Sequence, residues 1–143
     1  AEAELVDALR ANGVAALSLV AAAGERVLGH ILFSPVRVDG DGRPWSALGL
    51  APMAVQPEDQ RRGVGSALVR AGLEQAPALG HVVVFVLGHP AYYPRFGFRP
   101  AHPLGLFDEY GAPDDAFLVA ELVPGALGGR RGTVRYRPEF AAL

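Results

Sequence analysis

The chain has 143 residues, of which 50% are hydrophobic and 20% are charged, and its formal net charge is -2. This length and composition predict a single folded domain over residues 1–143 rather than a disordered chain. The small negative charge argues against a general nucleic-acid binder. Neither cysteine nor lysine is present, which excludes disulfides, thiolate metal sites, cysteine nucleophiles and lysine-based catalysis.

No apolar stretch approaches the roughly 20 residues that a membrane-spanning helix needs, and no signal peptide is visible. We therefore expect a cytoplasmic protein that does not contact a membrane. All 13 basic residues are arginine, and alanine is abundant. This bias favours a GC-rich, bacterial genome.

Apolar periodicity predicts the elements of the first half of the chain. Residues 1–13 carry an apolar stripe opposite charged residues, which is typical of a short amphipathic helix. Two apolar runs joined around residues 24–26 predict a β-hairpin, and a turn-rich segment, 39–44, separates it from a third strand over 45–55. Pro52 lies inside that strand, and because proline cannot donate to a ladder, we expect a bulge or a sheet edge there.

A helix over residues 64–77 opens the second half of the chain. Its inner face is expected to carry four apolar residues: Val64, Ala67, Leu68 and Ala71. A valine-rich strand over 81–87 follows, so strand, helix and strand form one βαβ unit with parallel strands. A second short helix is expected over 90–96, and two more strands are expected over 116–122 and 132–138. The predicted fold class is α+β: a mixed, mostly antiparallel sheet with one parallel crossover, flanked by helices.

The segment between the third strand and its helix reads Gln60-Arg61-Arg62-Gly63-Val64-Gly65-Ser66. Glycine lets a ligand approach the backbone closely. The first turn of a helix also presents unpaired N–H groups and partial positive charge. We therefore predict that this loop binds an anion, most simply a phosphate.

Two familiar phosphate-binding motifs lack residues that they need. A P-loop requires Gly-Lys-Ser/Thr, and the chain has no lysine. A dinucleotide-binding fingerprint requires three spaced glycines directly after a strand, whereas here residues 56–60 intervene and the third glycine is missing. A short Gly-x-Gly sequence by itself is equally typical of a tight strand-to-helix turn.

The whole loop resembles the Gln/Arg-x-x-Gly-x-Gly/Ala motif of the GCN5-related N-acetyltransferases (GNAT). A second segment, AYYPRFGFRP, is similar to the tyrosine helix of that family, which ends in Gly-Phe, and the spacing of the two segments also fits. The resemblance covers nearly the whole chain, and GHILFSPV and LVPGALGGRRGTVRY are similar to the YhbS-like branch. It implies the GNAT fold. The family usually begins with a strand and a helix before the segment that opens here, and we expect both to be absent from the N-terminus.

The resemblance implies acetyl-CoA as the cosubstrate, with no metal. In the family, amides of the loop hold the pyrophosphate, and the edge of the third strand pairs with pantetheine much as an added peptide strand does. A backbone N–H of that edge would polarise the thioester carbonyl. The implied cofactor-binding residues are Met53, Ala54, Val55, Gln60, Arg61, Arg62, Gly63, Val64, Gly65 and Ser66.

Tyr93 is the implied general acid, because it lies four residues before Gly97, where the family keeps that group. A tyrosine with a pKa near 10 suits a thiolate whose thiol has a pKa of about 8.5, whereas an ordinary carboxylic acid is already ionised at neutral pH. The alternative is a core tyrosine with a bonded hydroxyl. Tyr92 is expected to point elsewhere and to pack.

The implied reaction is transfer of acetyl from acetyl-CoA to a primary amine of a small molecule, peptide or protein, by direct attack. No acid lies between Trp45 and Val55, where the family often has one, and lone histidines near apolar strands are usually structural. We therefore assign no general base. The alternative function is a non-catalytic acyl-CoA-binding or sensing module with the same fold. A homodimer is among the assemblies that the resemblance allows.

Overall fold

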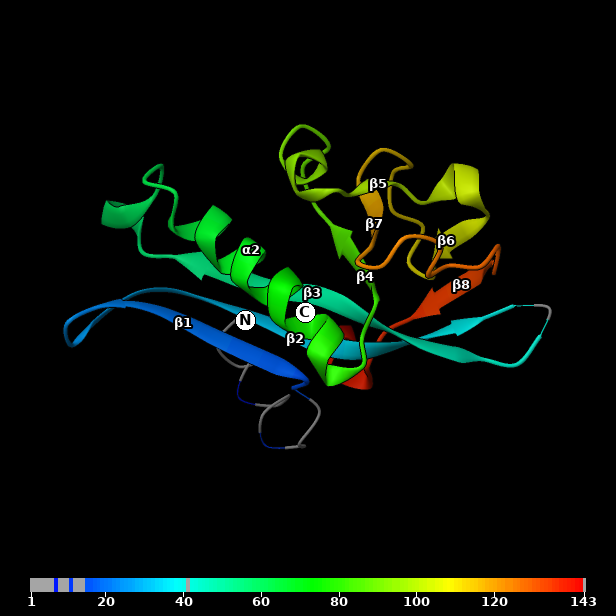
Figure 1. Ribbon diagram of the computed structural model, residues 1–143, viewed down its shortest axis with the longest axis horizontal. Coiled ribbons are helices and arrows are strands. Elements are labelled where there is room, and N and C mark those ends of the chain that lie inside the picture. The colour runs from blue at the N-terminus through cyan, green and yellow to red at the C-terminus, as the bar shows by residue number, and fades with distance from the viewer. Residues whose placement is uncertain (1–6, 8–10, 12–14, 41, 143) are drawn as a thin grey trace.

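The structure is a computed structural model that describes residues 7, 11, 15–40 and 42–142. Its centre is an eight-stranded mixed sheet, and an α-helix crosses one face of that sheet in front of β2 and β3 (Figure 1). The elements are β1 (Leu17–Ala23), β2 (Arg26–Asp39), β3 (Trp45–Val55), α2 (Val64–Gln75), β4 (Val83–Leu87), β5 (Arg99–Pro100), β6 (Leu106–Asp108), β7 (Phe117–Glu121) and β8 (Gly132–Arg135).

The predicted helix over residues 1–13 lies outside the described residues, except for Asp7 and Ala11, which are helical. The expectation that the usual first strand and helix of the family are absent also concerns a part of the chain outside the described residues. The predicted hairpin is confirmed: β1 and β2 pair antiparallel and turn at Gly24, whose φ of 61° is left-handed.

Short 3₁₀ turns connect the main elements: η1 (Pro57–Asp59), η2 (Ala76–Leu79), η3 (Tyr93–Phe96), η4 (His102–Leu104) and η5 (Pro138–Ala142). Two of them correct the sequence prediction. The expected helix over 90–96 is only the turn η3, because Pro94 lacks an N–H and disfavours the α conformation in the residue before it. Helix α2 ends at Gln75 and continues as η2, which contains Pro77.

The strand order is β5-β7-β4-β3-β2-β8-β6, and β1 lies beside the first part of β2. Strands β3 and β4 are parallel and joined through α2, as predicted. A second parallel pair, β6 with β8, was not predicted. Strand β8 falls within the strand expected over 132–138, but β6 has only 3 residues and is too short to give a clear period in the sequence. The remaining pairs are antiparallel, so the predicted mixed α+β sheet is confirmed.

Strand β3 is bulged at Pro52 and has one open edge. The β2–β3 ladder shifts register where Ala51 and Pro52 face Leu32, which confirms the predicted irregularity. On its other edge β3 pairs with β4 only at Leu48 and Gly49. Beyond that point the two strands diverge towards their C-terminal ends (Figure 1), so the last residues of β3 have no neighbouring strand on this edge in the described part of the chain.

Alternation along the strands builds an apolar cluster on each face of the sheet. Val84 and Val86 belong to the cluster under α2, whereas Val83 and Phe85 belong to the opposite one. The helix is seated through Gly72, where an added Cβ would lie 2.3 Å from Cε2 of the buried Phe33 ring.

This seating corrects the predicted inner face of α2. Leu68 is buried as expected, but Val69 and Gly72 also face the sheet, and Ala67 is exposed. Gly72 gave no apolar signal in the sequence because it has no side chain, although it is where α2 comes close to the Phe33 ring.

Candidate active site

The loop before α2 leaves the start of that helix open. Gly63 is the N-cap, with a left-handed φ of 82° and no side-chain capping hydrogen bond. The first turn carries no acidic residue, so its N–H groups and partial positive charge are directed at whatever binds there. Arg61 is also left-handed, with φ 65°, a conformation that non-glycine residues adopt rarely. The predicted anion loop therefore has the backbone that an anion site needs.

Two side chains anchor this loop to the sheet. The side-chain amide of Gln60 donates to the Val55 carbonyl at 3.1 Å, so it holds the loop to the end of β3. The Arg26 guanidinium donates to both carboxylate oxygens of Asp59 at 2.7 and 2.8 Å. Asp59 is only 2% exposed, and the hydrogen bonds from Arg26 are the main reason why the pKa of its carboxyl lies below the ordinary value.

The open edge of β3 meets the loop at the start of α2. Met53, Ala54 and Val55 pair with β2 on one edge and leave the other free. An added Cβ on Gly65 would lie 3.6 Å from Cε of Met53, which is ordinary contact. The structure thus brings together the two groups of predicted cofactor-binding residues, those of the strand end and those of the loop.

Tyr92 links η3 to α2 across the same region. Its hydroxyl lies 2.9 Å from Oγ of Ser66, and an added Cβ on Gly65 would lie 3.5 Å from it. Arg95 donates from Nε to the Tyr92 carbonyl at 2.8 Å and places its guanidinium over the ring. The expectation that Tyr92 only packs is therefore incomplete, because its hydroxyl belongs to the wall of the site.

Tyr93 lies in the core with its hydroxyl still accessible. The residue is 8% exposed, and its ring packs on the backbone of Gly88 and edge-on against Phe98. The hydroxyl has no hydrogen-bond partner in the described part of the chain, and it is not among the fully buried unpartnered atoms, so it retains contact with solvent. Burial raises the pKa of Tyr93 to about 12, which keeps the hydroxyl protonated at neutral pH.

Sequence reasoning missed three residues of this region: Arg26, Asp59 and Gly88. The first two are 33 residues apart, and nothing in the sequence pairs them. Gly88 had a faint signal, since it follows the apolar strand β4 directly. An added Cβ there would lie 2.2 Å from Cε2 of Tyr93, so only glycine leaves room for the ring in its present position.

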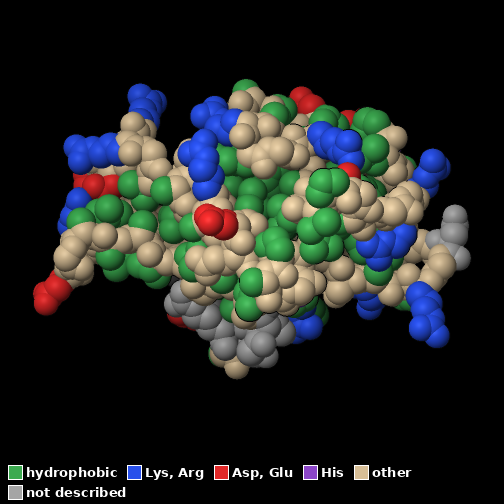
Figure 2. All heavy atoms as spheres, viewed as in Figure 1, with side chains coloured by type: hydrophobic (Ala, Val, Ile, Leu, Met, Phe, Trp, Pro, Cys, Tyr) green, Lys and Arg blue, Asp and Glu red, His purple; other side chains and the backbone are tan. Residues whose placement is uncertain are grey.

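The surface around the loop is basic. Arg61 and Arg62 are exposed, and Figure 2 shows basic side chains at the upper left, over the loop that leads into α2 and the neighbouring rim, with a smaller acidic group among them. This charge suits the phosphates of a nucleotide-bearing ligand.

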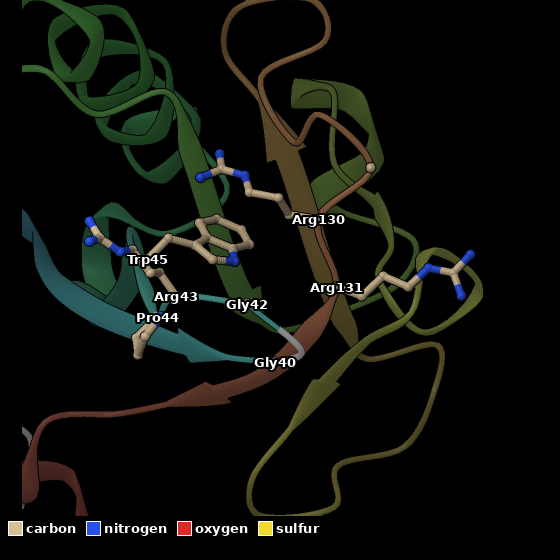
Figure 3. A pocket seen from close by; sticks show the side chains of 8 residues that line it. Gly40, Gly42, Arg43, Pro44, Trp45, Arg130 and Arg131 are labelled. Atoms are coloured by element: carbon tan, nitrogen blue, oxygen red, sulfur yellow. The ribbon is translucent and has the colours of Figure 1, made fainter.

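A separate hollow of about 470 Å³ lies at the opposite end of β3, lined by Gly40, Gly42, Arg43, Pro44, Trp45, Gly129, Arg130 and Arg131. Arg130 lies over the indole of Trp45 at 4.0 Å, whereas the side chains of Arg43 and Arg131 point away from the hollow (Figure 3). Strand β3 has 11 residues, so at about 3.3 Å per residue this hollow is roughly 35 Å from the loop. It is not part of the candidate active site.

None of the described helices is long and apolar enough to cross a bilayer. Within residues 15–40 and 42–142, no three His, Asp or Glu side chains are grouped so that they could hold a metal ion.

Residues 4–101 match the family model described as an acetyltransferase (GNAT) domain. The chain belongs to the GNAT family of acetyltransferases. This GNAT chain is 40% identical over 141 residues to the uncharacterized N-acetyltransferase YhbS of Escherichia coli K12, over 98% of this chain and 83% of the relative. These matches confirm the predicted family, its YhbS-like branch and the class of enzyme.

Two solved structures confirm the GNAT fold. The crystal structure of Escherichia coli YhbS in complex with CoA has a TM-score of 0.89 and 39% identity, covering 98% of this chain and 77% of that one. A GNAT acetyltransferase from Brucella melitensis in complex with acetyl-CoA has a TM-score of 0.75 and 38% identity, covering 97% and 77%.

Proposed function

We propose that this GNAT enzyme transfers the acetyl group of acetyl-CoA to a primary amine by direct attack, with Tyr93 as the general acid. The observation that carries the proposal is a convergence in space. The uncapped start of α2, the open edge of β3 at 53–55 and the turn η3 with Tyr92 directly before it meet in one region. The CoA and acetyl-CoA complexes of the two relatives support the same ligand here.

The described residues fit acetyl-CoA part by part. The pyrophosphate would accept hydrogen bonds from the amides of the first turn of α2, at residues 64–66, where no side-chain cap competes. Pantetheine would pair with the free edge of β3 as an added strand does. A backbone N–H of Met53, Ala54 or Val55 would then lie near the thioester carbonyl and stabilise the oxyanion.

The chemistry follows from this placement. The amine nitrogen attacks the thioester carbon, a C–N bond forms, and the oxyanion collapses as the C–S bond breaks. Tyr93 gives its proton to the departing sulfur and regains one from solvent, and the amine loses its own proton to a group that we do not assign. Because burial raises the pKa of Tyr93 to about 12, transfer to a fully hydrated thiolate would be uphill. In the same poorly solvated site, desolvation would also raise the pKa of the CoA thiol, so the two pKa values would lie closer together than in water.

Titration calorimetry and thiol release test the two halves of the proposal. Desulfo-CoA and acetyl-CoA should both bind, and NADH and ATP should bind much more weakly. A panel of amines is then tested for release of CoA thiol: a small aliphatic amine, an aminoglycoside, a peptide N-terminus and a lysine-containing peptide. At least one of them should serve as an acceptor. Binding without thiol release from any amine would instead support the acyl-CoA-sensing alternative.

The role of Tyr93 has its own test. Tyr93→Phe should lower kcat by about 10²–10⁴-fold with little change in acetyl-CoA affinity, since it removes an interaction made mainly in the transition state. Tyr110→Phe is the matched control, because Tyr110 is exposed and stacks on Tyr136 beyond β6. Wild-type turnover in Tyr93→Phe with a good acceptor would make Tyr93 a packing residue. The homodimer and the cytoplasmic location stay predictions from the sequence.

A further inference from the structure

We propose that Arg26 is a positioning residue of the cofactor site, because it holds and neutralises the buried carboxylate of Asp59 at the base of the loop that binds the pyrophosphate. This inference rests on the proposed binding of CoA at that loop. It assigns a role to the tip of the β1–β2 hairpin, which is distant in sequence from both cofactor-binding segments.

The geometry is that of a fixed pair rather than a loose surface contact. Arg26 is the first residue of β2, and it reaches both oxygens of Asp59 through two different nitrogens, at 2.7 and 2.8 Å. Such fork-shaped pairing fixes direction as well as distance. The Arg26 side chain is 51% exposed and that of Asp59 only 3%. Glu58, at 3.6 Å from Arg26, is largely exposed.

Asp59 would oppose anion binding if Arg26 were absent. It ends η1 and lies two residues before the left-handed Arg61, a stretch of chain that spans at most about 7 Å. The distance from Asp59 to Arg61 along the loop is thus less than the roughly 8–10 Å over which physiological salt screens a charge. An uncompensated carboxylate there would repel the pyrophosphate, and a carboxylate without its partner would also seek water and move the loop.

The loop needs such an anchor because its backbone is held in an unusual shape. Arg61 and Gly63 are both left-handed, and the helix that follows has no side-chain cap at Gly63. In the described part of the chain, two short side-chain contacts tie residues 57–63 to the sheet, the Gln60–Val55 hydrogen bond and the Arg26–Asp59 pair. The exposed Glu58 adds only a longer contact with Arg26, at 3.6 Å. The pair therefore combines a mechanical and an electrostatic role.

A double-mutant cycle separates these roles, with Arg26→Gln, Asp59→Asn and the double variant. Arg99→Gln is the matched control, because Arg99 makes a comparable ion pair with Glu121 at 2.6 Å between β5 and β7 and its loss changes net charge equally. CoA dissociation constants would be measured by calorimetry at low salt and at about 0.5 M salt, together with kcat, the acetyl-CoA KM and the melting temperature.

Arg26→Gln should weaken CoA binding about tenfold and raise KM in parallel, with kcat at saturation within about twofold. Asp59→Asn should weaken binding less, and the double variant should return to within about threefold of the wild type, because the repelling charge is gone. Higher salt should reduce the difference in CoA dissociation constant between Arg26→Gln and the double variant, because salt screens the repulsion. Arg99→Gln should bind CoA like the wild type.

Unchanged affinity in Arg26→Gln would overturn the inference, and so would a double variant that binds no better than Arg26→Gln. If Arg26→Gln does not fold, Arg26→Lys replaces it, because lysine keeps the charge without the fork. CoA affinity of Arg26→Lys within about threefold of the wild type supports neutralisation of Asp59, and a tenfold loss contradicts it. If the wild type itself does not bind CoA, the proposed function is wrong, and with it this inference.

Discussion

Replacing Gly88 by alanine puts a methyl group where the ring of Tyr93 lies. The new Cβ would be 2.2 Å from Cε2 and 2.7 Å from Cδ2, whereas ordinary contact begins at 3.4 Å. The ring must therefore move by about 1.2 Å to regain ordinary contact. It is held by edge-on neighbours, Tyr92 at 5.0 Å and Phe98 at 5.6 Å between ring centroids, so this shift also moves the hydroxyl.

A misplacement of about 1 Å in a catalytic group costs on the order of 100-fold in rate. We therefore expect Gly88→Ala to lower kcat about 100-fold, with the acetyl-CoA KM changed by less than about threefold, since Gly88 is outside the pyrophosphate loop. Overpacking should also cost about 1–3 kcal/mol of unfolding free energy. Thiol-release kinetics and denaturant unfolding measure these effects.

The double variant Gly88→Ala/Tyr93→Phe shows whether Gly88 acts through Tyr93. If it does, the double variant should be no slower than Tyr93→Phe alone, because the hydroxyl is already gone. A loss equal to the product of the two single losses would refute this reasoning. So would a folded Gly88→Ala variant with wild-type kcat.

Three further predictions concern the loop, the helix and pH. Gly65→Val should weaken CoA binding at least tenfold, about 1.4 kcal/mol. Gly65→Ala should bind nearly normally, because its Cβ would meet Tyr92 and Met53 at 3.5–3.7 Å, which is ordinary contact. Equal CoA affinities of the two variants in calorimetry would contradict the phosphate-loop interpretation. Gly72→Ala should destabilise the fold in urea unfolding. Its Cβ would lie 2.3 Å from the Phe33 ring, so we expect an overpacking cost near the upper end of about 1–3 kcal/mol, which exceeds a gain in helix propensity of about 1 kcal/mol. A stabilised variant would show that α2 shifts freely. Because burial raises the pKa of Tyr93 to about 12, its contribution to stability is complete below about pH 10 and is lost as pH rises through 12, so wild type should lose stability relative to Tyr93→Phe only in that alkaline window. If kcat already falls as the pH rises towards 9, and this fall disappears in Tyr93→Phe, the result would contradict this pKa.

Local patterns in the sequence determined the frame of the site. The hairpin, the parallel β3–α2–β4 unit and the irregularity at Pro52 all follow from short-range rules: turn glycines, strand periodicity and the missing N–H of proline. Gly63 and Gly65, at the start of α2, likewise predict an open helix start from the local sequence alone. Each of these predictions uses patterns within short stretches of the chain, together with a general rule on how consecutive elements connect, which is why the sequence was sufficient for them.

Only the tertiary structure decided which side chains meet in the site. Arg26 and Asp59 are 33 residues apart, and Ser66 and Tyr92 are 26 apart. Their contacts depend on strand register and on how α2 is seated through Gly72, and no local preference encodes either of these. The buried ring of Tyr93 is a similar case, since its position depends on the absence of a side chain at Gly88. A sequence displays side chains and their period, but a close approach made possible by a missing side chain becomes visible only when the chain is folded.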